Sequence, residues 1–140
     1  MVIMKASKQS ETGVMPSERL LADMTAYNEE LVKAGIVLAG EGLRPSSQGA
    51  RVRFEGSETS VLNGPFAETN QLIAGFWIFK VKSMEEAIDW VHRVPNSDGL
   101  HHEIEIRPVA EAEDFGAALT PELQAREQKL REQLERAQNG

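Results

Sequence analysis

The side chains whose positions could support chemistry here carry carboxylate and guanidinium groups. The sequence contains no cysteine, which excludes a thiolate nucleophile and a cysteine-ligated metal. Glu41 lies between two glycines after an apolar run, where a tight turn at a strand end would hold its carboxylate as a base or hydrogen-bond acceptor. Glu68 offers a second carboxylate, and Arg107 or Arg51 could stabilise developing negative charge. We therefore predict Glu41, Glu68 and Arg107 as catalytic candidates; a solvated loop acid is the alternative interpretation of Glu41.

The stretch from Val61 to Val81 positions most of the remaining candidates. Gly64 can adopt a positive φ, and Pro65 fixes its own φ while keeping the preceding residue out of the helical region, so a sharp turn is expected. Polar residues 68–71 then form a short loop between rigid elements, a common place for binding groups. The ligand-binding candidates around this turn and on neighbouring predicted strands are Arg51, Asn63, Gly64, Pro65, Phe66 and His101.

Metal and cofactor motifs are sparse. His101 and His102 are adjacent on a predicted strand, so they point to opposite faces and cannot chelate one metal ion without a bulge. His92 stands alone on a predicted helix. The sequence also lacks a glycine-rich phosphate loop, a nucleophile elbow and a zinc-binding helix motif. We expect neither a metal site nor a cofactor.

Charge and hydropathy exclude several partners. The net charge is -7 and the 15 lysines and arginines are dispersed, so the basic footprint of a nucleic-acid binder is missing. The first apolar run, Val2 to Met4, is too short for a signal peptide or a membrane span. We expect no nucleic-acid or membrane partner and a cytoplasmic location.

The elements expected in the first half of the chain are a strand, a helix, a strand and a hairpin. Apolar residues 2–6 predict a strand and residues 7–13 a loop. Leu20, Met24, Tyr27 and Leu31 recur at helical spacing within 16–34, after the candidate cap Ser17. The segment 36–39 is apolar and β-branched. Residues 50–55 alternate, Gly56-Ser57 favours a turn, and 59–62 return.

The second half of the sequence predicts a strand over 72–81, a helix from the capping box at Ser83 to Pro95, a turn over 96–100 and a last strand over 101–109.

This order of elements favours an α+β fold: a ferredoxin-like plait, in which two helices cover one face of an antiparallel sheet. The uncovered side, bearing Arg51, Arg53, Glu103, Glu105 and Arg107, must then meet solvent, a ligand or another subunit.

The composition changes after residue 110. Residues 111–118 are acidic and small, and Thr120-Pro121-Glu122 begins a C-terminal helix. Three glutamate–arginine pairs at i,i+4 spacing stabilise this helix, while Leu123, Leu130, Leu134 and Ala137 give it a thin apolar line. We predict one α+β domain over 1–110, followed by an acidic linker and an amphipathic helix over 111–140, which either docks or remains a mobile tail.

Several segments together resemble one family. They are Gly40-Glu41-Gly42-Leu43, Asn63-Gly64-Pro65-Phe66-Ala67-Glu68-Thr69, the strand with Gly75, the Glu86-Ala87 helix, and Glu105-Ile106-Arg107-Pro108. With the segments 112–115 and 119–123, the chain from Val2 to about Leu123 is similar to the YCII-related proteins, in particular the group named for a DGPF motif. The resemblance implies a ferredoxin-like fold that dimerises sheet to sheet into an α+β barrel, in a family whose biochemical role is largely unassigned.

Two departures limit what the resemblance implies for the site. Asn63 stands where the motif has an aspartate, which keeps the turn chemistry but removes a charge. The histidine near the first helix that pairs with an aspartate in the YCII proteins proper has no counterpart, because no histidine precedes His92.

Three hypotheses therefore stay open. The first and favoured one is a module that binds a small molecule in a cleft of the homodimer. The second is a cofactor-independent isomerase, lyase or oxygenase-like enzyme with a carboxylate base. The third is an interaction scaffold without a ligand, whose C-terminal helix docks a partner.

Overall fold

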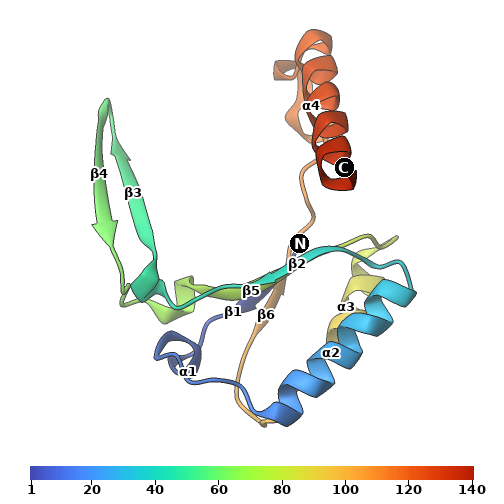
Figure 1. Ribbon diagram of the computed structural model, residues 1–140. Coiled ribbons are helices and arrows are strands. Elements are labelled where there is room, and N and C mark those ends of the chain that lie inside the picture. Colours follow the sequence, from blue (N-terminus) through green and yellow to red (C-terminus); the bar gives the residue numbers. More distant parts are fainter. The chain divides into compact units, whose positions relative to one another are not determined.

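The computed structural model describes residues 1–140 apart from the Thr69 side chain. The chain divides into two compact units, Met1–Pro108 and Val109–Gly140. The first contains an antiparallel sheet with helices and the second contains a long C-terminal helix, so the α+β class is confirmed (Figure 1).

The main sheet has four strands in the order β2-β5-β1-β6, and every neighbouring pair is antiparallel. The strands are β1 (Val2–Lys5), β2 (Val37–Gly42), β5 (Ile73–Phe79) and β6 (Ile104–Ile106). Because β2 and β6 are the edge strands, groups on them lie at opposite sides of the sheet.

Two helices connect these strands, α2 (Glu18–Lys33) and α3 (Met84–His92). Their starts follow the sequence: the hydroxyl of Ser17 accepts a hydrogen bond from the Leu20 amide, and that of Ser83 accepts one from Glu86. Both helices pack on the same sheet face, because Val2 and Trp77 share one core with Leu31 of α2 and with Trp90 of α3. The periodicity of α2 therefore predicted its buried stripe, in which Tyr27 and Leu31 are buried.

Tyr27 ties the two helices together. Its hydroxyl donates a hydrogen bond of 2.8 Å to the carbonyl oxygen of Trp90, and its ring meets Trp77 edge to face at 5.9 Å. Burial raises the pKa of Tyr27 to about 12. The tyrosine therefore remains a neutral donor across the physiological range.

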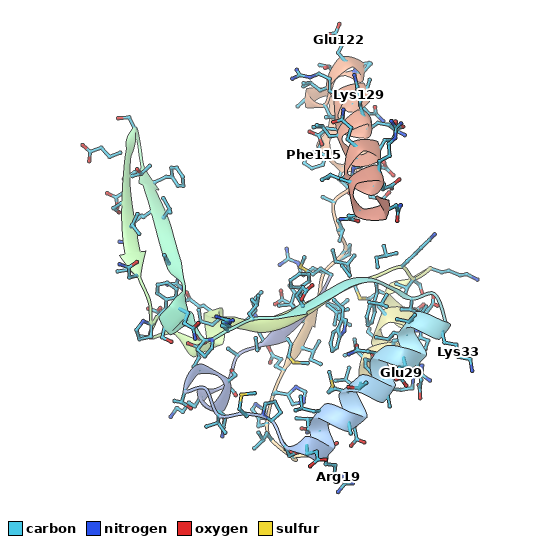
Figure 2. All side chains as sticks on the ribbon, viewed as in Figure 1. Arg19, Glu29, Lys33, Phe115, Glu122 and Lys129 are labelled. Atoms are coloured by element: carbon cyan, nitrogen blue, oxygen red, sulfur yellow. The ribbon has the colours of Figure 1, made fainter. Side chains whose placement is uncertain are left out.

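The other face of α2 is solvated. Figure 2 shows the side chains of Arg19, Glu29 and Lys33 on the outer side of this helix. A polar outer stripe opposite a buried inner one is what an amphipathic helix on a sheet requires.

The hairpin is separate from the main sheet, which corrects the expectation that its arginines share a sheet face with Glu105. Strands β3 (Ala50–Glu55) and β4 (Glu58–Asn63) pair in a two-stranded sheet of their own (Figure 1). The reason is that β2 and β5 pair directly from Val37 and Phe79 to Gly42 and Gly75, so the chain between them must leave the sheet. We call this hairpin, residues 50–63, the arm.

Three further boundaries differ from expectation. The predicted loop over 7–13 contains a one-turn helix, α1 (Lys8–Glu11), because Ser7 and Ser10 cap each other reciprocally. The turn 40–42 is part of β2, so Glu41 lies within a strand and not at its exit. The last strand is short, since its partner β1 pairs with it only over Val2–Met4.

The C-terminal unit has its own small arrangement. A kinked 3-10 segment, η3 (Ala112–Ala118), precedes α4 (Pro121–Asn139), whose first turn is capped by the Thr120 hydroxyl. The leucines Leu123, Leu130 and Leu134 remain 42%, 52% and 62% exposed, as expected for a thin apolar line on a solvated helix. No helix in the part of the chain that the structure describes has the length and apolar character needed to cross a bilayer.

Candidate functional site

The predicted turn is the centre of a compact polar cluster at the base of the arm. The hydroxyl of Ser46 accepts a hydrogen bond of 3.0 Å from the Phe66 amide and itself donates to the carboxylate of Glu11. The Ser46 amide also donates to Glu11, at 3.1 Å. The Glu11 carboxylate of α1 therefore holds Ser46 in place, and Ser46 in turn holds the turn at Phe66. Gly64 donates its amide to the carbonyl oxygen of Gly49 at 3.0 Å. The φ of Gly64 is not positive, so a close backbone approach, and not the left-handed region, is what requires a glycine here.

Three predicted candidates meet at this turn. The guanidinium carbon of Arg51 lies 3.9 Å from the centre of the Phe66 ring, and Arg51 Nη1 is 3.8 Å from Glu68 Oε2. The side chains of Arg51 and Glu68 are 39% and 56% exposed, so water competes with this ion pair and it contributes little stability. A cation stacked on an aromatic ring can nevertheless receive an anionic ligand group.

Sequence reasoning missed the residues that organise the turn, Ser46 and Glu11. They come from segments read as loops, and no spacing rule connects positions so far apart in the chain. The capping pattern of Ser7 and Ser10 is the one signal that could have revealed α1, which carries Glu11.

The second candidate region is the sheet face opposite the helices. Val2, Met4, Trp77 and Ile104 contribute to the core below the helices. Strand side chains alternate between faces, so Ile3, Phe76, Glu41 and Glu105 belong to the other face, which no described element of this unit covers. We call it the open face.

Charges at the β6 side of the open face form a triad. Lys5 Nζ lies 3.6 Å from Glu105 Oε1, and Arg107 Nη1 lies 3.5 Å from Glu105 Oε2. The Lys5 side chain is 23% exposed and the Arg107 side chain 71% exposed, so the guanidinium is the accessible cation. Burial lowers the pKa of the Met1 amino group, which donates to the Arg107 carbonyl oxygen at 2.6 Å. Lys5 was not among the predicted site residues.

The catalytic candidates do not converge within one chain. Glu41 is on the edge strand β2, whereas Arg107 follows the opposite edge strand β6. Three strand spacings separate the two edges, a distance of about 14 Å. Glu68 belongs instead to the turn cluster with Arg51. His101 is exposed and precedes β6 in the chain.

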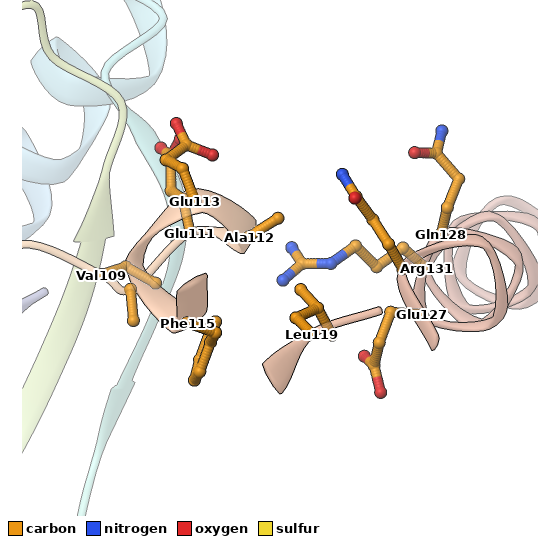
Figure 3. Close-up of a pocket in the computed structure, with 11 residues that line it drawn as sticks. Val109, Glu111, Ala112, Glu113, Phe115, Leu119, Glu127, Gln128 and Arg131 are labelled. Carbon is orange, nitrogen blue, oxygen red and sulfur yellow. The ribbon is translucent and has the colours of Figure 1, made fainter. Parts of the chain in front are cut away.

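The structure contains a cavity in each of the two compact units. One, of about 400 Å³, lies between α2 and the β2–β5 pair and is lined by Met24, Asn28, Gly42 and Trp77 among others. Glu41 borders it from β2, although strand alternation places the Glu41 side chain on the open face. The other, of about 610 Å³, lies inside the C-terminal unit between η3 and α4. Figure 3 shows the Arg131 side chain extending from α4 toward η3 in this second cavity. None of the other predicted site residues lines either cavity.

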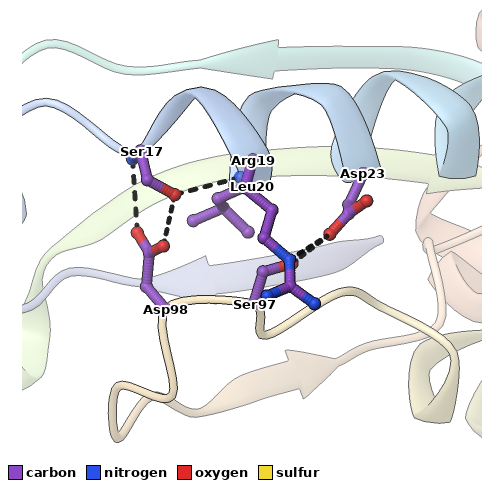
Figure 4. A network of polar contacts seen from close by, with 6 residues as sticks. All are labelled: Ser17, Arg19, Leu20, Asp23, Ser97 and Asp98. Carbon is purple, nitrogen blue, oxygen red and sulfur yellow. Dashed lines mark hydrogen bonds and ion pairs between the residues drawn. The ribbon is translucent and has the colours of Figure 1, made fainter.

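The loop before β6 is held by a separate polar network, drawn in Figure 4. Asp98 accepts hydrogen bonds from the amide and the hydroxyl of Ser17, and the Ser97 hydroxyl donates to Asp23. These contacts join the first turns of α2 to the loop and thereby fix where β6 begins. They therefore account for the loop conformation.

Among the described residues, no three histidine, aspartate or glutamate side chains come together in a group that could hold an ion.

Comparison with known proteins gives consistent results. Residues 1–113 match the YCII-related domain family. An uncharacterised protein of Rhizobium meliloti (strain 1021) is 33% identical over 93 residues, which cover 66% of this chain and 75% of that protein. The resemblance to the YCII-related proteins is thereby confirmed, and the chain belongs to that family.

Proposed function

We propose that the protein is a homodimeric small-molecule binding protein, in which two ferredoxin-like plaits pack their open faces together around a shared cleft and form an α+β barrel. The open face carries this proposal. Its centre is apolar, with Ile3 and Phe76, and charged residues lie toward both edges. An apolar sheet face without a covering layer is unfavourable in water, and a second copy supplies a cover of the same shape.

The arm supports the same assembly. Val52, Phe54 and Val61 lie on one face of the hairpin, because Val52 is opposite Val61 in the register, and they are 55%, 75% and 65% exposed. A two-stranded hairpin by itself is marginally stable in water. A second subunit that covers this face would stabilise the arm.

The ligand we propose is a small molecule with an anionic group. Arg107 presents an exposed guanidinium on the open face, and the stacked Arg51 presents another beside the turn. Guanidinium groups bind carboxylates and phosphates in two-pronged geometry. Within a single chain the candidate base, Glu41, lies about 14 Å from Arg107 and cannot reach a ligand group that this guanidinium holds.

The assembly is tested by Phe76→Arg. Each new guanidinium would lie beside the Glu41 carboxylate, its cross-strand neighbour, and taking such a charge pair out of water at the centre of a packed interface costs several kcal/mol that the attraction between the two charges does not return. Sedimentation velocity at micromolar concentration is expected to give a dimer for the native chain and a monomer for the variant. The control is Val32→Arg, a 67% exposed position on α2, which should remain a dimer. A native chain that sediments as a monomer would refute the proposal.

Ligand binding is tested by Arg107→Ala. Thermal-shift measurements against a library of small carboxylates and phosphates should yield at least one compound that stabilises the native dimer. The variant should fold and dimerise but lose at least tenfold in affinity, because a charged hydrogen bond contributes about 1.5 to 3 kcal/mol. Arg19→Ala, on the outer side of α2, is the matched control. Equal ligand-induced increases in melting temperature for the native and Arg107→Ala proteins would show that Arg107 does not contact the ligand.

A further inference from the structure

The charges on the open face are distributed unequally between its two edges. The register places Glu41, Phe76, Ile3 and Glu105 in one row across the sheet, from edge strand β2 to edge strand β6. Glu41 has no ion-pair partner among the side chains that the structure describes. The β2 edge of this row is therefore negative.

The β6 edge has the opposite sign. Lys5 and Arg107 each pair with Glu105, so two cations share one carboxylate and the triad keeps one positive charge. Strand alternation places the exposed Glu103 carboxylate on the same side, and the Met1 amino group at the Arg107 carbonyl oxygen offsets its charge. The surplus lies mainly on Arg107, whose side chain is 71% exposed. One sheet face therefore has a negative edge, an apolar centre and a positive edge.

Two symmetric arrangements can pack such faces together with their strands aligned. A two-fold axis across the strands places each edge over the same edge of the partner, so that Glu41 faces Glu41 of the partner subunit and triad faces triad. An axis along the strands places β2 over the partner's β6. Like charges brought together at an interface are strongly unfavourable, whereas opposite charges select partner and register.

We propose that the two-fold axis of the homodimer runs along the strands, so that Glu41 of one subunit faces the Lys5–Glu105–Arg107 triad of the partner subunit. This inference rests on the proposed sheet-to-sheet dimer. It makes each site a product of both chains, because the carboxylate and the guanidinium that one chain holds apart meet across the interface. Facing sheets lie about 10 Å apart, a gap that glutamate and arginine side chains can span together.

The composite site also restricts the ligand. One wall offers an acceptor, the Glu41 carboxylate; the opposite wall offers donors, the Arg107 guanidinium and the Lys5 ammonium; and Phe76 and Ile3 form an apolar floor. Such a site suits a small molecule with a carboxylate or phosphate at one end and an N–H or O–H donor at the other, such as a hydroxy acid or an amino acid.

Charge reversal distinguishes the two arrangements. The variants are Glu41→Arg, Arg107→Glu and the double variant, and the dimer dissociation constant is measured by sedimentation equilibrium over a dilution series. With the axis along the strands, each single change creates like-charge contacts at two symmetric places and should raise the constant about 100-fold. The double variant restores opposite charges and should return to within about tenfold of the native value.

The opposite outcome is equally specific. If the axis runs across the strands, Glu41→Arg replaces one like-charge contact by another, so single variants should dimerise as the native chain does and the double variant should show no rescue. That result would overturn the inference while leaving the proposed dimer intact. If the native protein formed no dimer, the result would instead refute the proposed function itself. Glu29→Arg, the same charge change on the outer side of α2, should have no effect.

Discussion

Replacing Gly64 with alanine is expected to destabilise the protein by at least about 3 kcal/mol, because the new methyl group would collide with main-chain atoms. A Cβ at this position would lie 1.8 Å from the carbonyl oxygen of Ser46 and 2.7 Å from its carbonyl carbon. That carbonyl cannot easily move away, since it accepts a hydrogen bond of 2.9 Å from the Gly49 amide. The free energy of unfolding in urea measures the effect.

Gly42→Ala is the matched control for this change. Gly42 is a strand residue, a methyl group added to it would meet nothing within 4 Å, and its backbone does not require a positive φ. Alanine there should leave stability unchanged or raise it slightly, because it reduces the freedom of the unfolded chain. Similar unfolding free energies for the two variants would mean that the Ser46 segment can move aside.

Leu31→Ala should cost about 2 to 5 kcal/mol, which is a large share of the stability of a typical domain. Leu31 is 0% exposed and lies in the core with Val2, Tyr27, Ile36 and Trp77. The cavity left by its side chain would face rigid neighbours from the sheet and from α2, so little relaxation is available. Urea unfolding followed by tryptophan fluorescence would report the loss directly.

Leu21→Ala, on the same helix, separates core packing from helix propensity. Leu21 is 49% exposed, and the same chemical change there should alter stability by no more than about 0.5 kcal/mol. A comparable loss at both positions would show that α2 is stabilised by contacts outside the core assigned to it.

The assignment of function depends on which atoms the fold brings together. Arg51, Phe66 and Glu68 were chosen from the sequence, and the turn does bring both Phe66 and Glu68 into contact with Arg51. Glu41 and Arg107 were chosen in the same way, but the strand order separates them. Residue type therefore identifies candidates, whereas the strand order decides which candidates can act together.

Local signals in the sequence determined the long helices, the arm and the family. Serine and threonine caps at positions 17, 83 and 120, apolar spacing and the Gly56-Ser57 turn act over a few residues, so their outcome is readable without the rest of the chain.

Three features could be read from the folded structure but not from the sequence: the arm leaves the sheet, Glu41 lies within a strand, and Ser46 and Glu11 hold the turn. Each of these depends on contacts between segments distant in sequence: β2 pairing with β5, and α1 meeting residue 46. Strand pairing is fixed by which surfaces can be buried together, and that is a property of the whole folded unit.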